Sequence, residues 1–197
     1  SLKSKIFWVT GSGVYRAASW RVAPEALKLA AQVAGFVGIP SAIIKKRAAS
    51  FDAPAGRLEI IAKNKGCIFI NDTTATNPGA ATHSLYMIRR AFKKNKQISI
   101  ITGGEDKKFP AHDIREYARA IIKLKINSII IPGSFSEKLK RSLAKYESAN
   151  SMSDAVRRSS LKGGVVALVP GAASFNMFKN EFDRALEFKK AIKRSRP

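Results

Sequence analysis

The sequence has few residues of the kinds that form disulfides or bind transition metals. It contains one cysteine, Cys67, and two histidines, His83 and His112. No disulfide can form within the chain, which favours a reducing compartment, and we expect a cytoplasmic protein. Because the histidines have no cysteine partners at metal-binding spacing, we expect no metal ligands in this chain. Cys67 lies in an apolar run, as is typical of a small buried hydrophobic side chain.

The sequence also lacks a long apolar run and a secretory signal pattern. No apolar stretch reaches the roughly 18 residues that a membrane-spanning helix needs, so no membrane partner is expected. The sequence begins with Ser1 in place of Met, which predicts processing or truncation. Its 197 residues, 45% of them hydrophobic, suffice for one full domain and part of another.

Acidic residues are scarce, with 14 aspartates and glutamates against 36 lysines and arginines, and the net charge is +22. Such a charge attracts nucleic acids and anionic membranes, so a basic nucleic-acid-binding protein is one alternative. The basic clusters, however, are scattered near the ends of the expected helices, where the helix dipole favours cations. Charge alone gives only nonspecific affinity, so any nucleic-acid binding is expected to be nonspecific.

Strands and helices alternate through most of the sequence. The expected strands are residues 57–62, 67–70, 97–102, 127–132 and 164–169, and the expected helices are residues 79–93, 112–124, 135–145, 152–161 and 174–194. Several strands are apolar on both faces, which is typical of strands covered by helices on two sides. The pattern predicts the α/β class, with a Rossmann-like, mostly parallel sheet flanked by helices. In the last helix the apolar spacing predicts a core-facing stripe of Phe178, Phe182, Ala185 and Leu186.

The first fifty residues form a separate, mainly helical segment in this prediction. Apolar faces and breaker residues predict helices over residues 24–37 and 40–49. Proline and glycine then interrupt any periodic pattern in Phe51–Gly56. We therefore expect two parts, a short remnant of one domain at residues 1–52 and the α/β domain at residues 53–197.

Polar or glycine-rich turns follow three of the expected strands. Asn71–Asn77 follow the first, Gly103 to Lys107 follow the second, and Gly171–Ser174 follow the third. Because the carboxyl ends of parallel strands meet at one edge of a sheet, the three turns predict one shared site. Backbone N–H groups, hydroxyl groups and a lysine at such an edge suit an anionic small molecule.

The individual side chains in these turns allow two interpretations each. Asp72 could hold a pair of ribose hydroxyls or bond its own turn. Thr76 and Asn77 could meet an anion at a helix N-terminus or act as ordinary helix caps. Lys107 could bind an anion or remain solvated. Ser174 could act as the N-cap of the last helix or meet an anionic ligand at the same helix end. No nucleophile–base pair is visible, so no catalytic residue is expected in this chain.

Three segments, in order and spacing, resemble the motifs of the C-terminal domain of the Mur ligases. They are Asn71–Ala80, Thr102–Lys107 and Val169–Asn180. Residues 1–50 are similar to the tail of the family's central, ATP-binding domain. Within the family the resemblance is to the ligases that add D-glutamate to UDP-N-acetylmuramoyl-L-alanine in peptidoglycan synthesis, with ATP and Mg²⁺ in the complete enzyme.

The resemblance implies a reaction in which ATP phosphorylates the carboxylate of UDP-N-acetylmuramoyl-L-alanine and the amine of D-glutamate attacks the acyl phosphate. The implied D-glutamate-binding residues are Thr76, Lys107, Ser174 and Phe175. The implied nucleotide-binding residues are Arg57, Asp72, Thr74 and Asn77. No P-loop, magnesium-binding carboxylate or UDP-binding domain is expected here, so the chain alone should not catalyse ligation. A monomer is expected, and a non-catalytic Mur-ligase-like binding module is the alternative.

The chain departs from the family's motifs at four positions. Thr74 stands in place of a lysine, and Asp106 stands in place of a glycine, which is expected to alter its loop. Ala172 stands in place of a cysteine. An aromatic residue that follows Lys179-Asn180 in the family is displaced by one position to Phe182, which turns it by about 100° on a helix.

Overall fold

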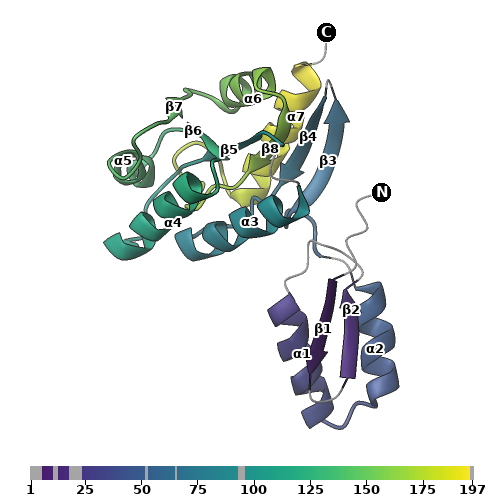
Figure 1. Ribbon diagram of the computed structural model, residues 1–197. Coiled ribbons are helices and arrows are strands. Elements are labelled where there is room, and N and C mark those ends of the chain that lie inside the picture. Colours follow the sequence, from purple (N-terminus) through teal and green to yellow (C-terminus); the bar gives the residue numbers. More distant parts are fainter. Residues whose placement is uncertain are drawn as a thin grey trace. The chain divides into compact units, whose positions relative to one another are not determined.

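The computed structural model describes residues 6–10, 13–17, 24–51, 53–64, 66–92 and 96–195. The chain divides into two compact units, Ser1–Ala55 and Gly56–Pro197, and both are drawn in Figure 1. The expected boundary lay between residues 52 and 53. The assignment of the first unit to the tail of a central, ATP-binding domain remains a prediction.

The first unit consists of a β-hairpin and a pair of helices. The antiparallel strands are β1 (Ile6–Thr10) and β2 (Gly13–Ala17), and the helices are α1 (Pro24–Phe36) and α2 (Ser41–Ser50). The pair of helices was predicted, whereas β2 was not, because it is defined by its pairing with β1 more than by its own sequence. The two helices bury Leu27, Ala31, Ile44 and Ala48.

The second unit is built on a six-stranded sheet with the strand order β3-β4-β8-β5-β6-β7. The strands are β3 (Glu59–Asn64), β4 (Cys67–Asn71), β5 (Ile98–Thr102), β6 (Asn127–Ile130), β7 (Glu147–Ser148) and β8 (Gly164–Leu168). Strand β3 is antiparallel to β4, and every other neighbouring pair is parallel. The predicted α/β class with a mostly parallel sheet is confirmed.

Five helices cover this sheet in two groups. They are α3 (Pro78–Ala91), α4 (Ala111–Lys123), α5 (Ser134–Lys140), α6 (Met152–Leu161) and α7 (Glu181–Arg194). Helices α3 and α4 pack side by side, as do α6 and α7 (Figure 1). Strand β5 and most of β8 are buried on both faces, as the apolar strand sequences predicted. One core cluster joins residues of β4, β5, β6 and β8 to residues of α6 and α7.

The prediction for the last helix was wrong at its start. Helix α7 begins at Glu181, not at residue 174, because Asn180 is its N-cap. The Asn180 side-chain oxygen accepts hydrogen bonds from the backbone N–H groups of Phe182 (3.0 Å) and Asp183 (2.9 Å). Ser174 lies six residues before the cap and therefore does not cap this helix.

The predicted apolar stripe of α7 was also partly wrong. Ala185 is buried, but Phe182 and Leu186 are 63% and 48% exposed, and Phe178 is buried in the loop that precedes the helix. The helix instead buries Arg184, Ala185, Phe188, Ala191 and Ile192. The stripe was misread because an arginine occupies a core-facing position that the apolar pattern could not include.

Candidate functional site

The three polar turns lie at one edge of the sheet, because β4, β8 and β5 are adjacent and parallel. Backbone hydrogen bonds join the loops that follow these strands. Gly171 N–H donates to the carbonyl oxygen of Ala75 at 2.9 Å. Glu105 and Ala173 exchange a pair of backbone hydrogen bonds of 3.0 and 3.1 Å. The sequence elements that predicted a shared site therefore form one connected surface.

The loop after β5 needs a glycine at residue 104 because it approaches its neighbours very closely. Gly104 has a φ of 132°, and a Cβ atom there would lie 2.1 Å from the carbonyl oxygen of Ala173. The Gly104 N–H donates to Ser136 Oγ at 3.1 Å, and that hydroxyl donates to the carbonyl oxygen of Ile131 at 2.6 Å. The Ser136 hydroxyl in the first turn of α5 thus holds the glycine-rich loop in place.

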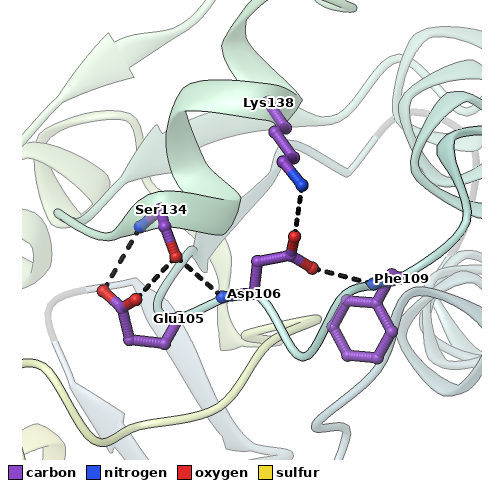
Figure 2. Close-up of polar contacts among 5 residues, drawn as sticks. All are labelled: Glu105, Asp106, Phe109, Ser134 and Lys138. Carbon is purple, nitrogen blue, oxygen red and sulfur yellow. Dashed lines mark hydrogen bonds and ion pairs between the residues drawn. The ribbon is translucent and has the colours of Figure 1, made fainter.

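A second serine of α5 holds the acidic part of the same loop, as Figure 2 shows. Ser134 Oγ donates to Glu105 Oε2 at 2.6 Å and accepts a hydrogen bond from Asp106 N–H at 3.0 Å. The Asp106 carboxylate accepts a hydrogen bond from Phe109 N–H at 2.9 Å and forms an ion pair with Lys138. These four contacts therefore fix the two acidic residues between β5 and α4.

Asp106, at the position where the resemblance implies a glycine, needs no glycine there, because its backbone lies outside the left-handed region. The residue other than glycine with a left-handed backbone in this loop is Lys108, with a φ of 63°. Burial raises the pKa of Asp106, but the hydrogen bonds from Lys138 and from the Phe109 N–H outweigh it and bring the pKa below its ordinary value. The carboxylate is thus ionised and structural, and it closes the turn instead of disrupting it.

The four residues expected at D-glutamate lie on the loops at this edge of the sheet. Thr76 is half-buried after β4, and Lys107 is exposed after β5. Ser174 is 3% exposed after β8, and the neighbouring Phe175 is 68% exposed. The structure thus brings the loops of these residues together, with a cation and an aromatic ring facing solvent.

Two of the four residues expected at the nucleotide hold the first residues of the second unit. Asp72 is 1% exposed, and its Oδ1 accepts a hydrogen bond of 3.0 Å from Leu58 N–H. Thr74 Oγ1 donates to the carbonyl oxygen of Gly56 at 3.2 Å, and its backbone N–H donates to the same oxygen at 3.3 Å. Both side chains therefore have structural partners in this conformation.

The other two residues expected at the nucleotide are exposed. Asn77 is the N-cap of α3, where its side-chain oxygen accepts a hydrogen bond of 2.8 Å from Ala80 N–H. Arg57 is exposed, and it lies between the buried residues Gly56 and Leu58. The four residues thus lie around the segment that opens the second unit and the turn that leads into α3.

Arg184 is a residue of this region that the sequence did not reveal. Its side chain is completely buried, with 0% exposure. Nε donates to Thr73 Oγ1 at 3.2 Å, Nη2 to the carbonyl oxygen of Thr73 at 2.9 Å, and Nη1 to the carbonyl oxygen of Ala172 at 3.1 Å. Desolvation lowers the pKa of Arg184 to about 10, opposed by the charge of Glu181, so the guanidinium stays protonated at neutral pH.

A sequence signal for Arg184 existed, although it was hidden. Arg184 precedes Phe188 by one helical turn and therefore lies on the buried face of α7. With the helix correctly started at Glu181, a charged residue on that face would have marked a buried polar contact. Ser134 and Ser136 had no such signal, because both resemble ordinary residues of a helix start.

The residues that the structure describes contain no cluster of three or more histidine, cysteine, aspartate or glutamate side chains that could hold a metal ion. Cys67 is buried at 2% exposure, as its apolar context predicted. Across the described parts of the chain, every helix is too short or too polar to span a bilayer.

Comparisons with known proteins give close agreement with one group of ligases. The chain is similar to UDP-N-acetylmuramoylalanine–D-glutamate ligase of Caldanaerobacter subterraneus subsp. tengcongensis, with 31% identity over 83% of this chain and 36% of that protein. It is also 31% identical to the ligase of the same name from Roseiflexus sp., over 79% of this chain and 34% of that protein. The chain thus spans about a third of the length of these curated relatives. No protein-family model matches it.

A solved structure shows the same fold over nearly the whole chain. A crystal structure of MurF from Acinetobacter baumannii matches with a TM-score of 0.67 and 17% identity, over 94% of this chain and 42% of that one. At that identity the match shows the fold alone, and the family follows from the sequence relatives. The chain belongs to the Mur ligase family, and it corresponds to the C-terminal portion of these ligases.

Proposed function

We propose that the chain is the C-terminal portion of an ATP-dependent ligase that adds D-glutamate to UDP-N-acetylmuramoyl-L-alanine. The observation that carries the proposal is the joining of three loops, after β4, β5 and β8, at one edge of the sheet. Two relatives with 31% identity bear the name of that ligase, which favours the same amino acid. The proposed role of this chain is to hold the amino acid with its amine free to attack.

The chemistry of the loops suits a small dicarboxylic acid. Lys107 offers an exposed ammonium group to a carboxylate, and Thr76 adds a hydroxyl donor. Ser174 lies buried within the loop that follows β8, and the exposed ring of Phe175 can cover the methylene groups of the acid. One cation, two hydroxyl groups and one aromatic surface would thus fix the direction of a D-amino acid.

The nucleotide would meet this chain near the segment that opens the second unit. Arg57 is exposed there and can supply a cation to phosphate oxygens. Asp72 and Thr74 already bond the backbone of Leu58 and Gly56, so nucleotide contacts by these side chains would replace or supplement those bonds. ATP supplies the phosphoryl group that activates the substrate carboxylate. Since the described residues offer no metal-binding cluster, we assign no Mg²⁺ step to this chain.

The experiment that tests the proposal is an NMR titration of the ¹⁵N-labelled chain with D-glutamate, with L-glutamate as the stereochemical control. We expect the amide signals of Thr76, Lys107, Ser174 and Phe175 to shift with D-glutamate first. Lys107→Ala should weaken binding about tenfold, because a charge-assisted contact is lost. Lys123→Ala is the matched control, since Lys123 is exposed at the far end of α4.

Three results would count against the proposal. Equal responses to D- and L-glutamate would show that the loops do not select the expected amino acid. Equal affinities of the Lys107 and Lys123 variants would show that Lys107 is only solvated. Binding of random-sequence DNA with a steep salt dependence, without any response to glutamate, would favour the nucleic-acid alternative instead.

A further inference from the structure

One side chain connects two of the three loops of the candidate site from inside the core. Thr73 follows β4 and Ala172 follows β8, and the Arg184 guanidinium donates to both residues. The Thr73 hydroxyl extends this hydrogen-bond network to α7. It accepts a hydrogen bond from Arg184 Nε and donates one to the carbonyl oxygen of Glu181 at 2.6 Å. The two loops and the first turn of α7 thus share one hydrogen-bonded junction.

We propose that Arg184 is a positioning residue of the acid-binding site and that it acts through Thr73, an inference that rests on the function proposed above. Thr76 lies three residues beyond Thr73, and Ser174 lies two residues beyond Ala172. Arg184 therefore sets the distance between the two loops from which these hydroxyl groups reach the ligand. It does not touch the ligand itself, since its side chain is completely buried.

The identity of this side chain supports a geometric role over a purely stabilising one. Among the described residues no ion pair includes Arg184, and its side chain donates hydrogen bonds to one hydroxyl and two carbonyl oxygens. Burying a charge costs free energy that an apolar side chain of the same volume would not cost. A planar guanidinium, however, can donate in several fixed directions at once, which a lysine or an apolar residue cannot do.

The test compares four single variants, and the double variant that combines Arg184→Lys with Thr73→Val, with the wild-type chain. Arg184→Lys keeps the charge and removes the planar guanidinium with its several N–H donors. Thr73→Val removes the hydroxyl, whereas Thr73→Ser retains it. Phe188→Leu is the control for lost stability, because Phe188 is buried one turn along α7 and packs on Phe69 away from the junction. For each chain we measure the unfolding midpoint, the D-glutamate Kd and the hydrogen exchange of the Gly171 amide, which bonds the two loops together.

We expect Arg184→Lys and Thr73→Val to raise the Kd about tenfold or more and to speed exchange at Gly171. Thr73→Ser should retain the wild-type Kd within about twofold, and the double variant should be no weaker than either single one, because the two residues act as one unit. Phe188→Leu should lower the unfolding midpoint and leave the Kd unchanged.

Two results separate the failure of this inference from the failure of the proposed function. If Phe188→Leu raises the Kd as much as Arg184→Lys, Arg184 contributes only stability and the inference is overturned. If the wild-type chain does not respond to D-glutamate, the proposed function is overturned. In that case the Gly171 exchange still decides whether Arg184 holds the two loops, since this measurement needs no ligand.

Discussion

Asp72 Oδ1 accepts a hydrogen bond of 3.0 Å from the backbone N–H of Leu58, and the two residues are only 1% and 3% exposed. Leu58 has a φ of 47°, a left-handed conformation that costs a residue other than glycine about 1–2 kcal/mol. The carboxylate therefore stabilises an unfavourable turn at the start of the second unit, whatever it also does for a nucleotide.

Replacing Asp72 should reveal this structural role. Asp72→Ala should lower the free energy of unfolding by about 2 kcal/mol, because the buried Leu58 N–H loses its acceptor. Asp72→Asn keeps an oxygen at the same place and should lose about half as much. Urea unfolding at pH 7 provides the measurement. Equal stability of the alanine variant and the wild type would show that the turn does not depend on this bond.

The start of α7 can be tested with a pair of alanine variants. Asn180→Ala should cost about 1 kcal/mol, because two backbone N–H groups lose the side-chain oxygen that caps them. Ser174→Ala should cost about 0.5 kcal/mol or less, because Ser174 does not cap the helix. A larger loss for Ser174→Ala than for Asn180→Ala in urea unfolding would contradict the start at Glu181 and support the predicted start at residue 174.

Gly104 and Gly163 separate backbone strain from steric contact. Gly163 has a φ of 70° with open space around it, so Gly163→Ala should cost about 1–2 kcal/mol for the left-handed backbone alone. Gly104→Ala adds a collision with the Ala173 carbonyl oxygen and should cost about 4 kcal/mol or more. Similar thermal midpoints for both variants would contradict the close approach of the β5 and β8 loops.

Asp106 should make the stability depend on pH in the acid range. Its pKa is lowered in the folded state, so its contribution is complete above the ordinary value of about 4 and is lost as the pH falls through the lower folded-state value. We expect Asp106→Asn to be about 1 kcal/mol less stable than the wild type at pH 7, a modest value because Lys138 is half exposed.

The difference between Asp106→Asn and the wild type should shrink between pH 5 and pH 3, since the asparagine does not titrate. Denaturant unfolding at several pH values measures this change. Glu116→Gln is the matched control, because Glu116 is exposed on α4. Removal of its charge should leave the pH dependence of the free energy of unfolding in the acid range the same as in the wild type. A difference in the free energy of unfolding that stays constant across this pH range would show that the contacts of Asp106 do not depend on its charge.

Periodicity and turn residues predicted the α/β fold well because the strands are apolar and the breaks between elements are marked. Strand β7 was missed because Glu147–Ser148 is too short to show a pattern. The C-terminal end of α5 was placed too far along, at residue 145 instead of Lys140, because nothing in Arg141–Lys145 breaks a helix locally. In both cases the decisive contacts come from neighbouring strands and loops.

The candidate site was predictable at the level of loops but not of partners. The order of the motifs and the parallel sheet placed Thr76, Lys107 and Ser174 at one edge. The residues that hold the loops, Ser136 and Arg184, act across 32 and 111 positions of the chain, and local patterns do not report such distances. The burial of Asp72 and its bond to Leu58 escaped prediction for the same reason.

Strand β8 is the last strand in the sequence, yet it lies between β4 and β5 in the sheet. During synthesis on the ribosome, almost one hundred further residues are added after β4 before its parallel neighbour β8 is complete. Such long-range pairing slows folding and leaves apolar strand edges exposed in the nascent chain. A chain that stopped before Gly164 would therefore lack the β8 loop of the candidate site as well as the middle strand of the sheet.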